Sequence, residues 1–200
     1  MKTIAEQIKE YKKILQEDFS LKDIKNKDFN YLINIAFNST SPEILLALAK
    51  DRDWKIRYSV AENKNIPPEI LYFLSKNKDR RIRYLVSLNK NSSPETLALL
   101  AYDKKPDIRY MVARHSNTTP DILNILAKDG NGEIRSRCAF NPKTPPATLD
   151  FLSHDEYTGV RISVASNPNT SEKTLKFLKN VDENESVRTA AKKNLSSRSL

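Results

Sequence analysis

Apolar residues recur along this chain with a period of 26 residues, which no single helix or strand produces. Two leucine columns keep the period without a break: Leu45, Leu71, Leu97, Leu123, Leu149 and Leu175, and Leu48, Leu74, Leu100, Leu126, Leu152 and Leu178. A third column holds isoleucine or valine directly before an arginine: Ile56, Ile82, Ile108, Ile134, Val160 and Val187. A period of this length is typical of repeat proteins, in which each unit buries its apolar face against the next.

Each unit has the pattern of two short helices. The first begins with a hydroxyl, a proline and a glutamate, as in residues 40–43, which is a capping box with proline in the first turn. The second runs through segments such as residues 54–63, where Ile56 and Val60 share one face. An asparagine column ends it, and we expect these residues to close the helix in the left-handed conformation. The column contains Asn63, Asn89, His115, Asn141, Asn167 and Asn194.

The pattern predicts an all-α solenoid of about six 26-residue, two-helix repeats over residues 28–194. Helices of about ten residues are unstable alone in water, so stacking must hold them. Residues 28–38 have the pattern of a second helix without its first. Residues 1–27 are expected to form an N-terminal capping helix, because apolar residues recur at helical spacing in its first 19 positions. Residues 195–200 are expected to be a frayed tail.

The Val-Arg, Ala-x-Asn-Pro, Thr-Pro and Leu-x-x-Leu elements together resemble the leucine-rich repeat variant family. They occur in residues 160–170, which are followed by Leu175 and Leu178, and in residues 134–145. The resemblance covers roughly residues 28–194. It implies a right-handed superhelix similar to HEAT repeats, in which the paired helices are α/α or α/3₁₀. Some members carry an N-terminal cysteine cluster with an iron–sulfur centre, but this chain has only Cys138, so that cofactor is not expected.

Composition excludes several classes of site. With 3 Gly, 1 Cys and 2 His, the chain lacks the material for glycine-rich phosphate loops, disulfide scaffolds and most metal sites. We therefore expect no cofactor and no metal. The N-terminus is charged where a signal peptide needs an apolar run, and no stretch has the length of a membrane helix, so a cytoplasmic protein without membrane contact is expected.

The sequence does not predict an enzyme. Cys138 falls in the apolar Val60 column, where a buried packing role is favoured over a reactive thiol. His115 belongs to the asparagine column, and His154 to a column of lysines. The leucine-rich repeat variant family has no common catalytic residues to transfer. A HEAT-like DNA-processing enzyme remains a remote alternative that rests on fold analogy alone.

Aspartate precedes arginine by six residues in most units, which predicts a structural ladder along the stack, because the planar fork of arginine bridges two acceptors. Partner recognition is the alternative role for these columns. The ladder comprises Asp51, Asp103, Asp129, Asp155 and Asp182, with Arg57, Arg83, Arg109, Arg135, Arg161 and Arg188. Asn77 stands at the remaining aspartate position.

Departures from the repeat indicate function better than the repeat itself does. The chain carries a net charge of +9, and residues 63–88 hold six basic and two acidic side chains, whereas residues 141–166 hold two and three. Equivalent turns should stack along one edge, which is basic in its first half. The candidate contacts on this edge are Arg52, Lys55, Lys76, Lys78, Arg80, Arg81, Lys104 and Lys105. The candidate aromatic anchors beside it are Tyr58, Tyr84 and Tyr110, for which packing between neighbouring helices is the alternative.

These features favour a non-catalytic binding scaffold whose surface recognises a protein or peptide, with an acidic partner favoured by the charge. The alternative is DNA or RNA binding through the basic edge of the first three repeats, where aromatic residues stack bases and lysines hold phosphates. The sequence leaves the oligomeric state open.

Overall fold

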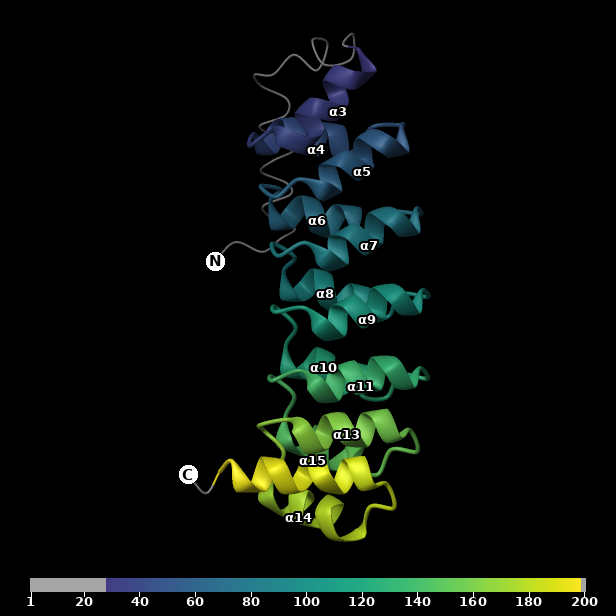
Figure 1. Ribbon diagram of the computed structural model, residues 1–200. Helices are drawn as coiled ribbons and strands as arrows, with labels where there is room; N and C mark the ends of the chain where they lie inside the picture. Colours follow the sequence, from purple (N-terminus) through teal and green to yellow (C-terminus); the bar gives the residue numbers. More distant parts are fainter. Residues whose placement is uncertain (1–27, 199–200) are drawn as a thin grey trace. The chain divides into compact units, whose positions relative to one another are not determined.

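Residues 28–198 are described by the computed structural model, and they contain α-helices and connecting turns but no strand (Figure 1). The capping helix expected at residues 1–27 lies outside these residues. The chain divides into two compact units, with the boundary between Leu100 and Ala101. Each unit is a stack of short helices, as expected for an α-solenoid.

The first unit alternates two layers of helices. It contains α3 (Phe29–Asn38), α4 (Pro42–Ala49), α5 (Trp54–Glu62), α6 (Pro68–Leu74), α7 (Arg80–Leu88) and α8 (Pro94–Leu100). Helices α3, α5 and α7 pack in succession in one layer, and α4, α6 and α8 do so in the other (Figure 1). Helix α3 is a second-type helix that lacks a described first-type partner, as its sequence indicates.

The second unit repeats this arrangement. It contains α9 (Pro106–Arg114), α10 (Pro120–Leu126), α11 (Gly132–Phe140), α12 (Pro146–Leu152), α13 (Thr158–Ser166), α14 (Glu172–Val181) and α15 (Glu185–Ser196). Helices α9, α11, α13 and α15 pack in succession. Helix α15 continues through Ser196, two residues into the segment expected to be a frayed tail. Both helix types are α-helical in residues 28–198, so the 3₁₀ alternative is not adopted.

The core is made of the columns that the period identifies. All twelve leucines of the two leucine columns are at most 2% exposed. The isoleucine and valine column of the second helices is buried against them, with exposed fractions of at most 3%. Because each helix buries only one face, a repeat acquires its core only from the neighbours that cover it.

The asparagine column ends the second-type helices from α5 to α13, as expected, but not in the left-handed conformation, and Asn194 lies inside α15. Asn63, Asn141 and Asn167 have extended backbones, and no described non-glycine residue has a positive φ. Instead, the buried amide of Asn167 donates to the backbone carbonyls of Ala139 and Asn141 in the preceding repeat, at 2.6 and 2.9 Å. Its Oδ1 atom accepts from the backbone N–H of Asn169. One side chain thus joins two repeats and fixes the turn that follows it.

The same bond recurs at the other asparagines. Asn63 donates to Ala36 and Ser39, Asn89 to Ala61 and Asn63, Asn141 to Ala113, and Asn194 to Ala165 and Asn167. At His115, Nδ1 likewise accepts from the backbone N–H of Asn117. A buried carbonyl without a donor costs about 1–3 kcal/mol, so this column contributes directly to stacking.

Replacing Asn167 with alanine should therefore destabilise the chain by about 2–3 kcal/mol, because it leaves buried carbonyls and one N–H without partners. Urea unfolding followed by circular dichroism measures the loss. Asn180→Ala is the control, because Asn180 is exposed on α14. Equal stability of the two variants would contradict a structural role for this column.

Candidate binding surface

Three arginines of the second unit form a ladder with aspartates. Nε and Nη2 of Arg135 donate to the two carboxylate oxygens of Asp155 at 2.6 and 2.9 Å. The third nitrogen, Nη1, donates to the backbone carbonyl of Asp129 at 2.8 Å. The other two rungs have the same geometry and join Arg109 to Asp129 and Arg161 to Asp182.

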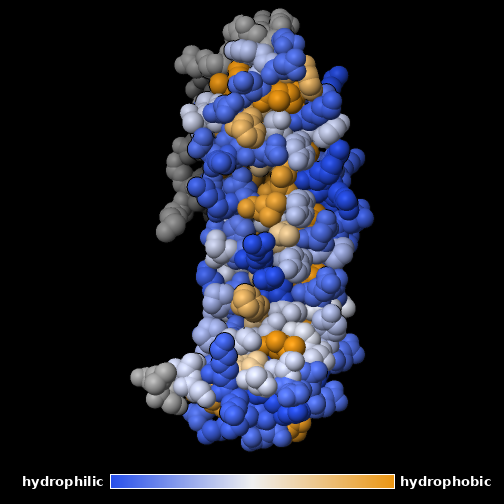
Figure 2. Space-filling model, viewed as in Figure 1, coloured by the Kyte–Doolittle hydropathy of each residue, from blue (hydrophilic) through white to orange (hydrophobic). Residues whose placement is uncertain are grey.

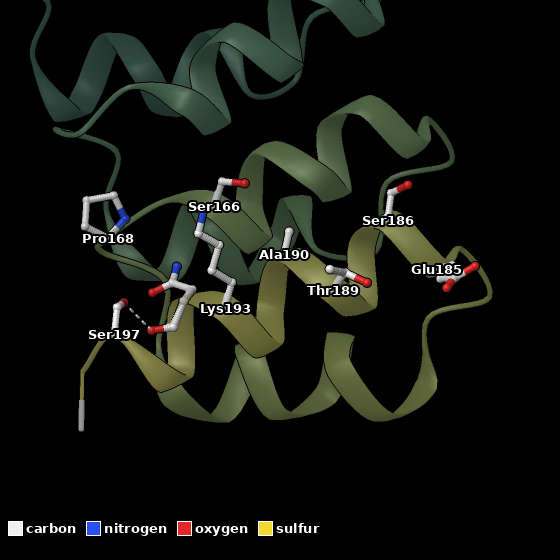
Figure 3. Close-up of a pocket in the computed structure, with 9 residues that line it drawn as sticks. Ser166, Pro168, Glu185, Ser186, Thr189, Ala190, Lys193 and Ser197 are labelled. Carbon is white, nitrogen blue, oxygen red and sulfur yellow. Dashed lines mark hydrogen bonds between the residues drawn. The ribbon is translucent and has the colours of Figure 1, made fainter. Parts of the chain in front are cut away.

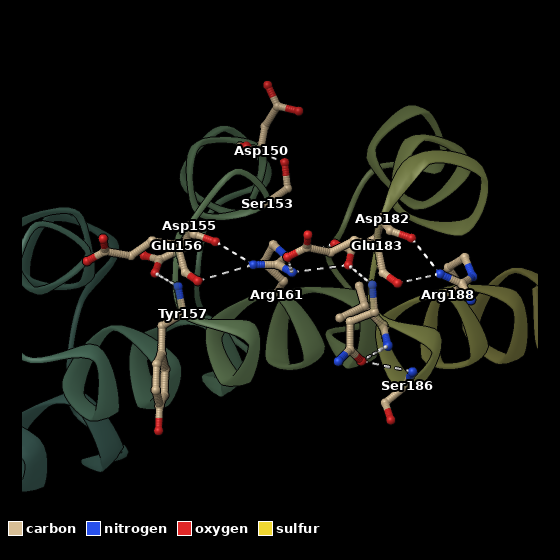
Figure 4. A network of polar contacts seen from close by, with 12 residues as sticks. Asp150, Ser153, Asp155, Glu156, Tyr157, Arg161, Asp182, Glu183, Ser186 and Arg188 are labelled. Atoms are coloured by element: carbon tan, nitrogen blue, oxygen red, sulfur yellow. Dashed lines mark hydrogen bonds and ion pairs between the residues drawn. The ribbon is translucent and has the colours of Figure 1, made fainter.

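Each rung is directional. The arginine binds the carboxylate of the following repeat, 20 or 21 residues later, and the backbone carbonyl six residues earlier. Figure 4 shows Arg161 between Asp155 on one side and Asp182 with Glu183 on the other. At the end of the chain, Arg188 donates to the backbone carbonyls of Asp182 and Glu183. The guanidiniums therefore hold the turns of neighbouring repeats together.

The aspartates of the rungs have pKa values below the ordinary carboxyl value. Burial by itself would raise the pKa of Asp155, but hydrogen bonds from Arg135 and from the backbone N–H of Tyr157 outweigh it. The same balance lowers the pKa of Asp129 and of Asp182. The partner arginines Arg109, Arg135 and Arg161 have raised pKa values, caused chiefly by these hydrogen bonds.

The first unit contains a rung without a carboxylate. Nη1 of Arg57 donates to the backbone carbonyls of Asp51 and Arg52 at 2.7 and 2.8 Å, as its counterparts do. The residue 20 positions later is Asn77, and the buried Nε atom of Arg57 has no hydrogen-bond partner. Arg83 donates to the carbonyls of Asn77 and Lys78.

The candidate cations of the first unit are exposed and lie on turns or in the first helical turn of α5 and α7. Of the six, only Arg81 forms an ion pair with a described residue, and its partner is Asp79 at 2.6 Å. The five exposed cations, which we call the basic turn residues, are Arg52, Lys55, Lys76, Lys78 and Arg80. Lys104 and Lys105 lie in the second unit, where Lys105 is the N-terminal cap of α9. A continuous edge that includes them stays a prediction.

An aromatic cluster accompanies the basic turn residues, and the sequence analysis missed its central member, Trp54. The guanidinium of Arg81 lies 3.7 Å from the centre of the Trp54 ring, and Tyr58 meets the same ring edge-on at 6.2 Å. Lys55 lies 5.7 Å from the ring of Phe29 and 6.0 Å from that of Trp54. The available sequence signal was the single tryptophan of the chain, at the start of a second helix.

The three tyrosines of the predicted row are half-buried and have different neighbours. Burial, and next the charge of Glu62, raise the pKa of Tyr58, which packs against Trp54. The hydroxyl of Tyr110 accepts a 2.7 Å bond from Arg137 on the next second-type helix. Tyr58 thus contacts its own helix and Tyr110 the next second-type helix, and a common anchoring role for the row stays a prediction.

The second-helix layer of the second unit has a different surface. A hollow of about 760 Å³ lies between the end of α13 and the outer face of α15 (Figure 3). Small side chains such as Ser186, Thr189 and Ala190 line it, with Lys193 and Glu185 among the charged residues. On the visible face of the molecule, apolar residues form separate patches among hydrophilic ones (Figure 2).

The remaining candidate groups for chemistry are structural. Burial raises the pKa of the Cys138 thiol to about 12, and its Sγ atom donates to the carbonyl of Leu123. The ring of the exposed His154 packs 4.9 Å from that of Phe177. Nowhere in residues 28–198 do three or more His, Cys, Asp or Glu side chains gather as a metal site requires. Every helix in that part of the chain is too short or too polar to cross a bilayer.

Comparison with solved structures gives this architecture a precedent. One match is described as a leucine-rich repeat variant with a novel repetitive protein structural motif. It aligns with a TM-score of 0.66 and 24% identity, over 86% of this chain and 68% of the other. The chain has a leucine-rich-repeat-variant-like fold.

At this level of identity, the match shows the repeat fold alone. No protein-family model matches the sequence, and no similar sequence was found among curated proteins. The leucine-rich-repeat-variant resemblance predicted from residues 28–194 is thereby confirmed at the level of the fold. The right hand of the superhelix stays a prediction.

The lowered pKa of Asp155 makes the stability of the ladder depend on pH. Because the folded pKa lies below the unfolded one, the ionised carboxylate stabilises the fold at neutral pH, and this contribution disappears as the pH falls below about 4. Asp155→Asn should lower the free energy of unfolding by about 1–3 kcal/mol at pH 7. The stability of this variant should also decline less than that of the wild type between pH 7 and 3. Urea midpoints across this range test it.

Asp121→Asn is the control for this comparison, because Asp121 is exposed and lacks an arginine partner among residues 28–198. It should retain the wild-type decline in stability. A decline of unchanged steepness in Asp155→Asn would contradict the role of the rung.

Proposed function

We propose that the chain is a non-catalytic binding scaffold whose first unit recognises an acidic segment of a protein partner. The observation that carries this proposal is the group of five basic turn residues without ion pairs beside the Trp54–Arg81 stack. The equivalent turns of the second unit carry Glu156 and Glu183, which pair with ladder arginines. The excess of positive charge is thus local and is not needed for stacking.

The basic turn residues supply long-range attraction rather than tight contacts. Their side chains are exposed, so each contributes little to affinity by itself, but together they steer an acidic segment toward this surface. Glu156 and Glu183 on turns of the second unit, and Glu133 in the first turn of α11, are exposed and would repel the same segment. The charge pattern therefore supports the first unit as the acidic segment's binding site.

The aromatic cluster supplies a pre-ordered anchor. Arg81 is held by three bonds to the carboxylate of Asp79 and lies over Trp54, so neither side chain loses much freedom on binding. Trp54 remains 37% exposed and Phe29 38%. Tryptophan and arginine are enriched among residues that dominate binding energy at protein interfaces.

The same arrangement favours a protein partner over a nucleic acid. In proteins that bind single-stranded nucleic acids, the bases stack on open aromatic faces. One face of Trp54 is covered by Arg81, and the Tyr58 ring packs perpendicular to it. Ladder arginines of the second unit are also committed to aspartates. Nucleic-acid binding is therefore the alternative outcome of the test.

Binding is tested with labelled peptides rich in Asp and Glu that contain one leucine or tryptophan, compared with duplex DNA and single-stranded RNA of similar charge. Fluorescence anisotropy at several salt concentrations measures affinity. Lys78→Glu with Arg80→Glu should weaken peptide binding by about tenfold, ~1.4 kcal/mol, because it removes two attractive charges and adds two repulsive ones.

Lys173→Glu with Lys179→Glu is the matched control, because it makes the same charge change on exposed α14 positions of the second unit. It should change peptide affinity by less than about twofold if the site is local. Binding of DNA or RNA with a steep salt dependence, and no peptide binding, would replace the proposal with the nucleic-acid alternative.

Trp54→Ala tests the anchor separately from charge. It should weaken binding of the leucine- or tryptophan-containing peptide by about tenfold. The reason is that truncating a tryptophan at the centre of an interface costs on the order of 1 kcal/mol or more of binding free energy. Phe177→Ala is matched in exposure, at 38% against 37%, and lies in the second unit. Equal effects of the two substitutions would refute the aromatic anchor.

A further inference from the structure

The ladder shows what an arginine of this column binds. In the three rungs of the second unit, Nη1 holds a backbone carbonyl, and the Nε–Nη2 edge holds a carboxylate with both of its oxygens. Arg57 has the same Nη1 bonds but no carboxylate at its other edge. Its Nε–H is buried without an acceptor, and Nη2 donates to none of residues 28–198.

Asn77 explains why the rung is open. Asp129, Asp155 and Asp182 use one oxygen, Oδ1, to accept the backbone N–H two residues later. Asn77 keeps this bond, because its Oδ1 accepts from the N–H of Asp79 at 2.9 Å. The other end of the amide is then a donor, whereas aspartate has a second acceptor there. An asparagine thus preserves the turn and leaves Arg57 without the oxygen pair that its counterparts bind.

The open rung lies among the basic turn residues. Nη1 of Arg57 holds the carbonyls of residues 51 and 52, and Asn77 lies between Lys76 and Lys78. The nearby carboxylate of Asp79 does not close the rung, because Arg81 donates to both of its oxygens. The missing group is therefore a carboxylate, at the place where an acidic segment is attracted.

We propose that Arg57 and Asn77 form an anchor site for a carboxylate of the acidic partner segment, a proposal that rests on the proposed function. The incoming side chain supplies the two oxygens for Nε and Nη2 of Arg57, and the amide nitrogen of Asn77 is a further donor to them. Because Nε is covered, the side chains around it shift as the carboxylate enters. The partner thereby completes the rung that the chain leaves open.

Acetate is the probe that tests the site without the partner. The arginine Nε–H signals are followed by NMR while acetate replaces chloride at constant ionic strength. The Arg57 signal should move in a saturable way, whereas that of Arg135, which is bound to Asp155, should not. No movement of the Arg57 signal, or equal movement of both, would overturn the site. A stronger response to phosphate than to acetate would overturn the assignment to a carboxylate.

Two reciprocal variants separate this site from general charge effects. Asn77→Asp should close the rung from within, raise the thermal midpoint and abolish the acetate response of Arg57. Asp155→Asn should lower the midpoint and create an acetate response at Arg135, because it reproduces the open rung in the second unit. If Asn77→Asp raised the midpoint but left the acetate response intact, the carboxylate would bind elsewhere and the site would be wrong.

The test also distinguishes the two proposals. In wild type, an acetate response at Arg57 without any binding of acidic peptides would remove the proposed partner and keep the carboxylate site. Peptide binding that Asn77→Asp weakens by less than about twofold, compared with about tenfold expected, would keep the scaffold and remove the anchor. Asn77→Glu also adds a carboxylate. A loss of peptide affinity greater than about twofold in this variant would further support occlusion of Arg57.

Discussion

The structure depends on satisfying the backbone carbonyls that each repeat exposes to the next. Short helices leave their last carbonyls without intrahelical donors, and stacking buries these groups. Buried asparagine amides such as that of Asn167 reach across to carbonyls of the preceding repeat, and Nη1 of each described ladder arginine holds the carbonyls of its own turn. The leucine columns supply the apolar area, but these polar side chains fix the register in which that area is buried.

This division of roles explains how the chain accommodates change. Positions that face the core or hold a carbonyl keep their residue type in most repeats. Residues on the turn surface and on the outer face of the second helices neither face the core nor bind these carbonyls. They carry Trp54 and Lys55 in the first unit, and Ser186 and Thr189 in the second. A scaffold of this kind changes its partner chemistry by substituting such positions without altering its packing.

The sequence predicted the fold because periodic leucines and prolines report stacking directly, and all twelve predicted leucines are buried. It predicted the wrong conformation for the asparagine column, because a local propensity for helix ends was outweighed by a bond across repeats. The sequence also predicted that the aspartate and arginine columns pair, but not that each arginine binds the aspartate of the following repeat, as Arg135 does. Trp54 was missed because its stacking partner, Arg81, lies 27 residues away in the next repeat.

The same reasoning gives Asn77 its significance. A substitution from aspartate to asparagine leaves every backbone bond of the turn in place, so the repeat pattern alone treats it as conservative. Its consequence appears only at Arg57, in another repeat, where a buried donor loses its acceptor. Such a donor is costly when nothing binds it and strongly attractive to a carboxylate when one arrives. An unfilled position in a structural ladder thus becomes a place where binding and stability are linked, because a ligand that fills it stabilises the folded chain.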